Sequence, residues 1–218
     1  MSYAIDITVM TPLVIDLRGK TVVICGGGEV GARKARFFIA GESHVIVASR
    51  HISHHFNGMA VERRVGDLSA MAKDELQALL CGSFLVVAVT SDQALNDRIG
   101  ATCREMGILC NNADGAIGDV IIPATTGGKA YCVAVTTFGK SPAFARYLRT
   151  YLEREGKDFD RMISLQERAR LSLKDKEFPV ERRGSVLWEI INDPEVWDCL
   201  KMDEASAWTL VHQRYLHG

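Results

Sequence analysis

The sequence predicts an α/β fold, in which a parallel sheet is followed by a small β-rich segment and a C-terminal helical domain. The first observation is a glycine cluster between an apolar run and a helical pattern near the N-terminus. The second is the alternation of strand-like and helix-like segments over the first 110 residues, which is typical of parallel sheets with right-handed crossovers. The third is a change of pattern at about Gly115, so we expect domains over residues 1–114, 115–150 and 151–218.

The glycine cluster follows the apolar run Val22–Ile24 and precedes a helical pattern. Gly26, Gly28 and Gly31 have the G-x-G-x-x-G spacing of a dinucleotide-binding turn. The three glycines allow a tight turn, close approach of a pyrophosphate to the backbone, and close packing of helix on strand. The helix that follows would direct its N–H groups at the phosphates. We therefore expect a Rossmann-type nucleotide-binding domain, with a purely structural glycine turn as the alternative.

The remaining elements of this domain follow from apolar runs and helix signals. Strands are predicted at residues 20–25, 44–49, 60–65, 84–89 and 107–111, and helices at 30–40, 73–80 and 92–106. Gly41 and Gly107 stand where helices end, and Asp92 stands where an N-cap is expected. The unbroken apolar run Phe84–Val89 is typical of a strand buried on both faces of a parallel sheet.

The second half of the chain has a different pattern. Two β-rich runs, 119–123 and 130–136, are separated by glycine-containing residues and predict a hairpin or paired strands outside the main sheet. Ser141 is a predicted N-cap and Pro142 the first residue of a helix over 142–155. The remainder, 158–218, has an amphipathic helical pattern with breaks at Pro179 and Pro194.

Composition narrows the class of protein. The chain has 218 residues, of which 47% are hydrophobic and 24% charged, and its net charge is −1. Apolar runs are too short for a membrane helix, and the start does not look like a signal peptide, so we expect a cytoplasmic protein with no membrane or nucleic-acid partner. The six cysteines are scattered without a C-x-x-C pair, which favours reduced thiols over disulfides or structural zinc.

Several motifs occur together in an order that identifies a family. Gly-Gly-Gly-x-Val-x-x-Arg-Lys-Ala begins at Gly26, and Gly-Lys-Ser-Pro-Ala begins at Gly139. Between them lie Ala88-Val-Thr-Ser-Asp92 with Asn96, and then Cys110-Asn-Asn-Ala-Asp114. In this order and spacing the chain resembles the precorrin-2 dehydrogenases, some of which are also sirohydrochlorin ferrochelatases. The resemblance implies oxidation of precorrin-2 to sirohydrochlorin with NAD as cofactor, in sirohaem or another branch of modified tetrapyrrole synthesis.

The expected cofactor residues combine the glycine turn with positions implied by the resemblance. They are Gly26, Gly28, Glu29, Val30, Gly31, Ser49, Arg50, Thr90 and Asn111. Many dinucleotide sites have an acidic residue at the end of the second strand to hold the adenosine ribose, whereas this strand ends in Ser49-Arg50. Because Arg50 could accept a 2′-phosphate, NADP is the alternative to NAD.

Asp114 is the catalytic residue that the resemblance implies. It follows the last predicted strand, at the edge where open α/β sheets bind their ligands. A carboxylate there could take the proton released when the macrocycle is oxidised, or protons displaced when a ferrous or cobaltous ion is inserted. The alternative is that Asp114 only begins a turn with Gly115.

The substrate of this family carries many carboxylates, and basic residues outnumber acidic ones over 140–183. The expected substrate-binding residues are Lys140, Ser141, Arg146 and Arg149, at or near the start of the predicted helix. Helix capping alone would also explain Ser141. Phe138 stands where the family usually has glycine, and a ring there could narrow the substrate pocket.

Two further expectations concern metals and assembly. His51, His54 and His55 include a His-x-x-His spacing, but no third ligand stands at a recognisable spacing, so we predict no resident metal site. Because segment 115–140 cannot easily fold back on the first sheet, we expect it to pair with a second subunit in a homodimer. The alternative to an enzyme is a regulatory module that binds NAD without chemistry.

Overall fold

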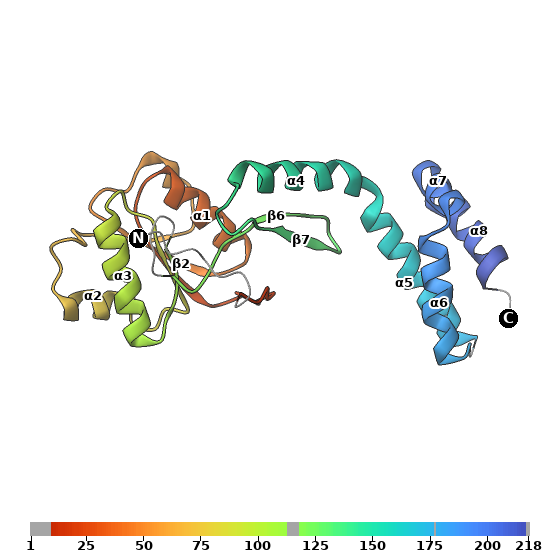
Figure 1. Ribbon diagram of the computed structural model, residues 1–218, viewed down its shortest axis with the longest axis horizontal. Helices are drawn as coiled ribbons and strands as arrows, with labels where there is room; N and C mark the ends of the chain where they lie inside the picture. Colours follow the sequence, from red (N-terminus) through yellow and green to blue (C-terminus); the bar gives the residue numbers. More distant parts are fainter. Residues whose placement is uncertain (1–9, 113–117, 177, 217–218) are drawn as a thin grey trace. The chain divides into compact units, whose positions relative to one another are not determined.

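The computed structural model describes residues 10–112, 118–176 and 178–216. The chain divides into two compact units, Met1–Ile122 and Pro123–Gly218, which are considered separately. Figure 1 shows the first unit as a sheet with helices and the second as a hairpin followed by helices.

The described part of the first unit contains a five-stranded parallel sheet in the order β3-β2-β1-β4-β5. Its strands are β1 (Thr21–Cys25), β2 (His44–Ser49), β3 (Glu62–Val65), β4 (Leu85–Ala88) and β5 (Leu109–Asn112). The helices α1 (Glu29–Ala40), α2 (Lys73–Leu80) and α3 (Gln93–Met106) alternate with them, and a short 3-10 helix covers His54–Phe56. The predicted strands and helices of this unit are confirmed, with boundary differences of one or two residues.

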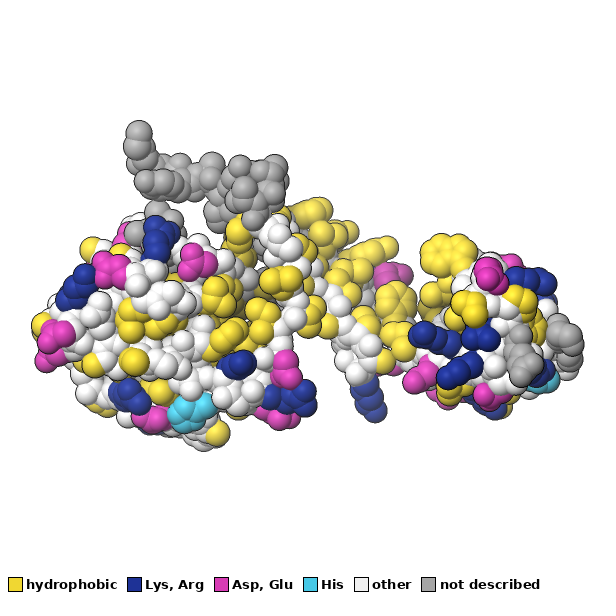
Figure 2. Space-filling view, turned by 90° about the horizontal axis from the view of Figure 1, so that it is seen from below, with side chains coloured by type: hydrophobic (Ala, Val, Ile, Leu, Met, Phe, Trp, Pro, Cys, Tyr) yellow, Lys and Arg dark blue, Asp and Glu magenta, His cyan; other side chains and the backbone are white. Residues whose placement is uncertain are grey.

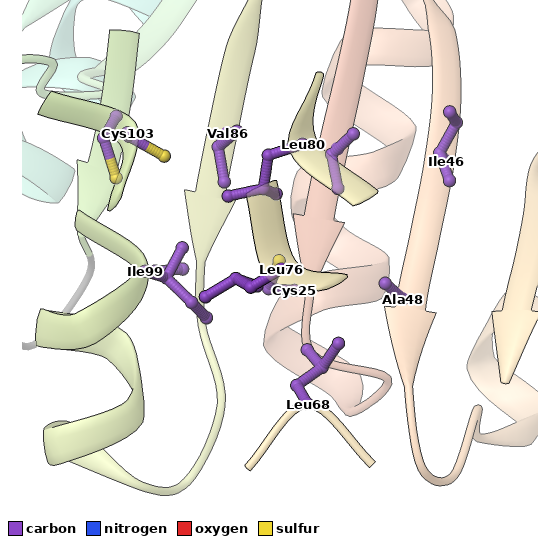
Figure 3. Close-up of a cluster of buried hydrophobic side chains, with 12 residues drawn as sticks. Cys25, Ile46, Ala48, Leu68, Leu76, Leu80, Val86, Ile99 and Cys103 are labelled. Carbon is purple, nitrogen blue, oxygen red and sulfur yellow. The ribbon is translucent and has the colours of Figure 1, made fainter. Parts of the chain in front are cut away.

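Alternate side chains of the central strands pack on opposite faces of the sheet. Val23 and Cys25 lie in one buried cluster with Leu76 of α2 and Ile99 of α3 (Figure 3). Val22 and Ile24 lie in the other, together with Ala35 and Phe38 of α1. The sheet is therefore buried on both faces, which explains the continuous apolar runs in the sequence.

The second unit begins with the antiparallel pair β6 (Ala124–Gly127) and β7 (Cys132–Val135). It continues with the helices α4 (Pro142–Glu155), α5 (Phe159–Asp175), α6 (Val180–Ile191), α7 (Pro194–Met202) and α8 (Glu204–Tyr215). The last four helices share one hydrophobic core that includes Leu173, Ile190 and Leu200. The structure confirms three predictions for this unit: a pair of strands, a helix over 142–155 and a helical C-terminal part. The two prolines mark helix starts, because Pro179 is the N-cap of α6 and Pro194 the first residue of α7.

The predicted strand over 119–123 is wrong. The N–H groups of Asp119 and Val120 both donate to the carbonyl oxygen of Cys110, at 2.8 and 3.0 Å, so this segment bonds to the end of the first sheet. Val120 and Ile122 pack against the core of the first unit, and Pro123 has no N–H to donate. The strand instead begins at Ala124 and includes residues that the sequence suggested as the turn.

One carboxylate attaches the hairpin turn to the helical part of the second unit. The Asp160 side chain of α5 accepts hydrogen bonds from the backbone N–H groups of Lys129 and Ala130, both at 2.9 Å. A Cβ atom at Gly128 would lie 2.1 Å from that carboxylate, so a side chain here would displace Asp160 from the turn. Tyr131 adds a hydrogen bond from its hydroxyl to the carbonyl oxygen of Gly156 at 3.1 Å. The turn is therefore held by long-range contacts as well as by its own pairing.

Three predicted helix ends have the expected geometry. The Asp92 carboxylate accepts from the N–H of Leu95, and the Ser141 hydroxyl accepts from the N–H of Phe144. Gly107 ends α3 in the left-handed conformation, with φ of 67°. In the part of the chain that the structure describes, no helix is long and apolar enough to cross a membrane.

Candidate nucleotide and substrate sites

The glycine turn joins β1 to α1, and three of its glycines are required by the protein's own backbone. A Cβ atom at Gly26 would lie 2.5 Å from the carbonyl oxygen of Val89, and Gly26 has a φ of 138°. A Cβ atom at Gly27 would lie 2.0 Å from the carbonyl oxygen of His51. One at Gly31 would lie 2.3 Å from the carbonyl oxygen of Gly26. Backbone therefore approaches each of these positions too closely for any side chain.

Gly28 differs from these three glycines. A Cβ atom there would meet no heavy atom of the described residues within 4 Å, and its φ of −84° suits any residue. Gly28 is also the N-cap of α1, so it has no side chain to occupy the first N–H groups of the helix. Glu29 and Val30 follow at exposed positions. This open helix start fits a pyrophosphate that approaches the backbone.

The loop after β4 is held by a buried amide. Asn96 of α3 is completely buried, and its Oδ1 accepts from the backbone N–H and the hydroxyl of Thr90 at 3.0 and 2.8 Å. Its Nδ2 donates to the carbonyl oxygen of Thr90 at 3.1 Å. The sequence suggested Thr90 as a cofactor residue, and the structure places it at the carboxyl edge of the sheet, beyond the end of β4. Asn96 follows the motif Ala88–Asp92, and the sequence alone predicted no role for it; in the structure it holds the backbone of this loop.

At the end of β2, Ser49 is half-buried and Arg50 is exposed. The Arg50 Nη1 lies 3.3 Å from Oδ2 of Asp67, a residue in the loop after β3. The sequence shows no acid at the end of the second strand, and Asp67 stands seventeen positions after Arg50. Strand pairing brings an acidic side chain there all the same.

Asn111 on β5 is buried, and both ends of its amide are engaged within the protein. Its Oδ1 accepts from Lys34 Nζ at 2.9 Å, and its Nδ2 donates to the carbonyl oxygen of Val120 at 2.7 Å. Lys34 belongs to the Arg-Lys-Ala part of the glycine motif, but the sequence alone does not show its contact 77 positions away. The Asn111 side chain therefore links α1 to the segment after β5.

The expected substrate residues belong to the second unit, and the expected catalytic Asp114 lies outside the described residues. Lys140 and Arg146 are exposed, and Ser141 caps α4. Arg149 forms an ion pair with Glu153 one turn later on the same helix. The structure thus brings Lys140, Ser141 and Arg146 to the first turns of α4, whereas Arg149 already has an acidic partner.

The three histidines with a His-x-x-His spacing lie near the glycine turn. His54 and His55 belong to the short 3-10 helix, with ring centroids 4.2 Å apart, and His51 is exposed. Among the residues that the structure describes, no group of three histidine, cysteine or acidic side chains is placed to hold a metal ion.

The chain is similar to several known proteins. Residues 13–124 match a family described as putative NAD(P)-binding. The precorrin-2 dehydrogenase of Methanosarcina barkeri is 35% identical over 192 residues, which is 86% of this chain and 85% of that protein. The chain belongs to the precorrin-2 dehydrogenase family.

Two other comparisons concern a longer protein and a solved structure. The siroheme synthase of Sodalis glossinidius is 34% identical over 143 residues, but this region is 65% of the chain and only 30% of that protein. The solved structure titled "SirC, precorrin-2 dehydrogenase" has a TM-score of 0.68 at 20% identity and covers 94% of this chain and 100% of its own. The structural match confirms the predicted fold.

The departure from the precorrin-2 dehydrogenase pattern at Phe138 has a structural correlate. Phe138 has a φ of 53°, in the left-handed region that favours glycine. Its N–H donates to the Thr136 hydroxyl at 3.0 Å, and Gly139 follows with φ of 78°. The glycine expected here from the resemblance therefore suits the backbone, and this chain places a half-buried ring there instead.

Proposed function

We propose that this protein oxidises precorrin-2 to sirohydrochlorin with NAD as the hydride acceptor. The observation that carries the proposal is the 35% identity to a precorrin-2 dehydrogenase, which extends over 86% of this chain. The open start of α1 at Gly28 supports nucleotide binding at the place that the family requires. The protein would thus belong to the synthesis of sirohaem or a related tetrapyrrole, and its cytoplasmic location stays a prediction.

NAD, when bound, supplies an acceptor for the hydride that leaves the macrocycle. The chain's own residues provide binding, orientation and proton transfer. The N–H groups at the start of α1 bind the pyrophosphate, and Asn96 keeps the loop at Thr90 in a fixed shape. Lys140 and Arg146 attract the carboxylates of the substrate. Asp114 accepts the proton released on oxidation, a role proposed from the resemblance.

An anaerobic absorbance assay tests the dehydrogenase. Precorrin-2 is generated in place and mixed with the protein and NAD+, without metal, and we expect the sirohydrochlorin spectrum together with an equal amount of NADH. The Asp114→Asn variant should bind NAD+ as the wild type does but oxidise precorrin-2 at least about 100-fold more slowly. Asp175→Asn, in the last turn of α5, is the matched control. Binding of NAD+ without any oxidation would instead support the regulatory module.

The similarity of this chain to siroheme synthases favours a second activity, the insertion of a metal into sirohydrochlorin. The test adds ferrous or cobaltous ion after complete oxidation and compares the rate of chelation with a protein-free control. Equal rates with and without the protein would rule out the chelatase.

We also propose that the protein is a homodimer formed through α4. Phe144, Tyr147 and Tyr151 are 52%, 61% and 43% exposed and stand at helical spacing on one side of α4. Figure 2 shows hydrophobic side chains exposed on the face of the molecule seen in that view. A second copy that covers this stripe would bury it.

Light scattering after size-exclusion chromatography tests the dimer. The wild type should have twice the chain mass of 24.0 kDa, and Tyr147→Glu should shift it toward the monomer. Trp188→Glu, which alters an exposed aromatic residue on α6, is the matched control and should leave the mass unchanged. A monomeric wild type would refute the proposal.

A further inference from the structure

We propose that Asp67 makes this site select NAD over NADP, by neutralising Arg50 and presenting a fixed carboxylate beside it. The inference rests on the proposed function, since it names the cofactor preference of the same nucleotide site. Arg50 pairs with an acid from the loop after the neighbouring strand β3, a contact that the sequence does not reveal.

The ends of β2 and β3 bring the two side chains together. Ser49 pairs with Val65 in the parallel register, and the N–H of Gly66 donates to the carbonyl oxygen of Ser49 at 3.1 Å. Arg50 and Asp67 therefore leave the sheet at the same edge, and their side chains meet at 3.3 Å. This is the carboxyl edge of the sheet, which also carries the glycine turn.

Hydrogen bonds within a local turn hold the Asp67 carboxylate in place, and the Arg50 side chain beside it is largely exposed. Asp67 Oδ1 accepts from the N–H and the hydroxyl of Ser69, at 3.0 and 2.6 Å. The hydrogen bonds from Ser69 lower the pKa of Asp67, so the carboxylate is ionised at neutral pH. The Arg50 side chain is 79% exposed and forms an ion pair with Asp67. The local turn thus holds a negative charge at a defined place beside a positive charge.

The two cofactors differ at the ribose 2′ position in a way that this pair can detect. NADP has a phosphate there, which an unpaired arginine would attract. NAD has a hydroxyl there, which can donate a hydrogen bond to a carboxylate. Together, Arg50 and Asp67 contribute no net charge, and the carboxylate repels the phosphate. An acid contributed from the loop after β3 thus replaces the one that usually ends the second strand.

The test is the binding of NAD+ and NADP+ to the full-length protein, measured by isothermal titration calorimetry. The wild type should bind NAD+ more tightly, and Asp67→Asn, which keeps an oxygen for Ser69, should shift the affinity ratio toward NADP+ by about tenfold or more. Arg50→Gln added to Asp67→Asn should remove the gain in NADP+ affinity. Glu62→Gln, on β3 and bonded to His44 and Arg64, is the matched control and should leave the ratio unchanged.

A second variant tests the inference without altering the turn at Asp67. Arg50→Glu should weaken the binding of NADP+ several-fold more than that of NAD+, because it adds negative charge at the same place. An unchanged affinity ratio in Asp67→Asn, or equal effects of Arg50→Glu on both nucleotides, would overturn the inference and leave the proposed function in place. NAD+ binding with the expected ratios but no oxidation of precorrin-2 would overturn the proposed function alone. A wild type that binds neither nucleotide would overturn both.

Discussion

Replacement of Gly28 by alanine tests nucleotide binding at the glycine turn without changing its fold. The added methyl group would enter open space, since no described atom lies within 4 Å of the Cβ position. The same change at Gly27 would place the Cβ atom 2.0 Å from the carbonyl oxygen of His51. Gly28→Ala should therefore fold normally and bind nucleotide poorly, whereas Gly27→Ala should be strongly destabilised.

The magnitudes follow from the geometry of Gly28. Its backbone suits alanine, and a less flexible unfolded chain stabilises the variant by about 0.4–1 kcal/mol. Alanine is a poorer N-cap than glycine by up to about 1 kcal/mol, so the two effects nearly cancel. The Tm should change by less than about 4 °C. Loss of one close phosphate contact, about 1.5–3 kcal/mol, lowers the affinity for NAD+ about 10- to 100-fold.

Thermal unfolding and calorimetric titration with NAD+ measure both quantities on the same samples. Gly184→Ala is a suitable control, because Gly184 lies in α6 and a Cβ atom there also meets no described atom within 4 Å. That variant should bind NAD+ normally and be slightly more stable than the wild type. If Gly28→Ala binds NAD+ as tightly as the wild type, the pyrophosphate does not approach this glycine and the reasoning fails.

Three further predictions concern buried polar groups. Asn96→Ala should lower the free energy of unfolding by about 2 kcal/mol and also weaken NAD+ binding, because it leaves the backbone groups of Thr90 without partners; urea unfolding and titration measure this. Asp193→Ala should lower the free energy of unfolding by about 2 kcal/mol, because Arg214 Nη1 and the Tyr215 hydroxyl donate to Asp193 at 2.6 and 2.7 Å. Urea unfolding measures this, and an unchanged free energy would show that these two hydrogen bonds contribute little to stability. Burial opposes ionisation of Asp193, but hydrogen bonds from Tyr215 and Arg214 outweigh it and lower the pKa, so its stabilising effect is present at neutral pH and is lost as the pH falls below about 4. The free energy of unfolding, measured against pH, should therefore fall more steeply at acidic pH for the wild type than for Asp193→Asn.

The first unit could be predicted from the sequence because its signals are local. The continuous apolar runs, the glycine turn and the caps at Asp92 and Gly107 each depend on a few neighbouring residues. The same is true of α4, whose start is set by Ser141 and Pro142. Such elements agree with the tertiary structure, so local patterns were sufficient.

What the sequence could not reveal depends on contacts between distant residues. Residues 119–123 have the composition of a strand, but the N–H groups of Asp119 and Val120 donate to the carbonyl oxygen of Cys110, a contact that depends on the folded sheet. Lys34 meets Asn111 only because α1 and β5 lie beside each other in the folded unit. The acid beside Arg50 was missed because strand pairing, and not sequence spacing, brings it there.

The link from Asp160 to the hairpin turn has a consequence for how the chain folds as it is synthesised. The strands β6 and β7 leave the ribosome before α5, so the turn at Lys129 at first has no carboxylate to bind its N–H groups. An isolated two-stranded hairpin is marginally stable in water. The turn therefore gains these two hydrogen bonds only after α5 has been made, and a nascent chain released before Asp160 would have a less stable hairpin.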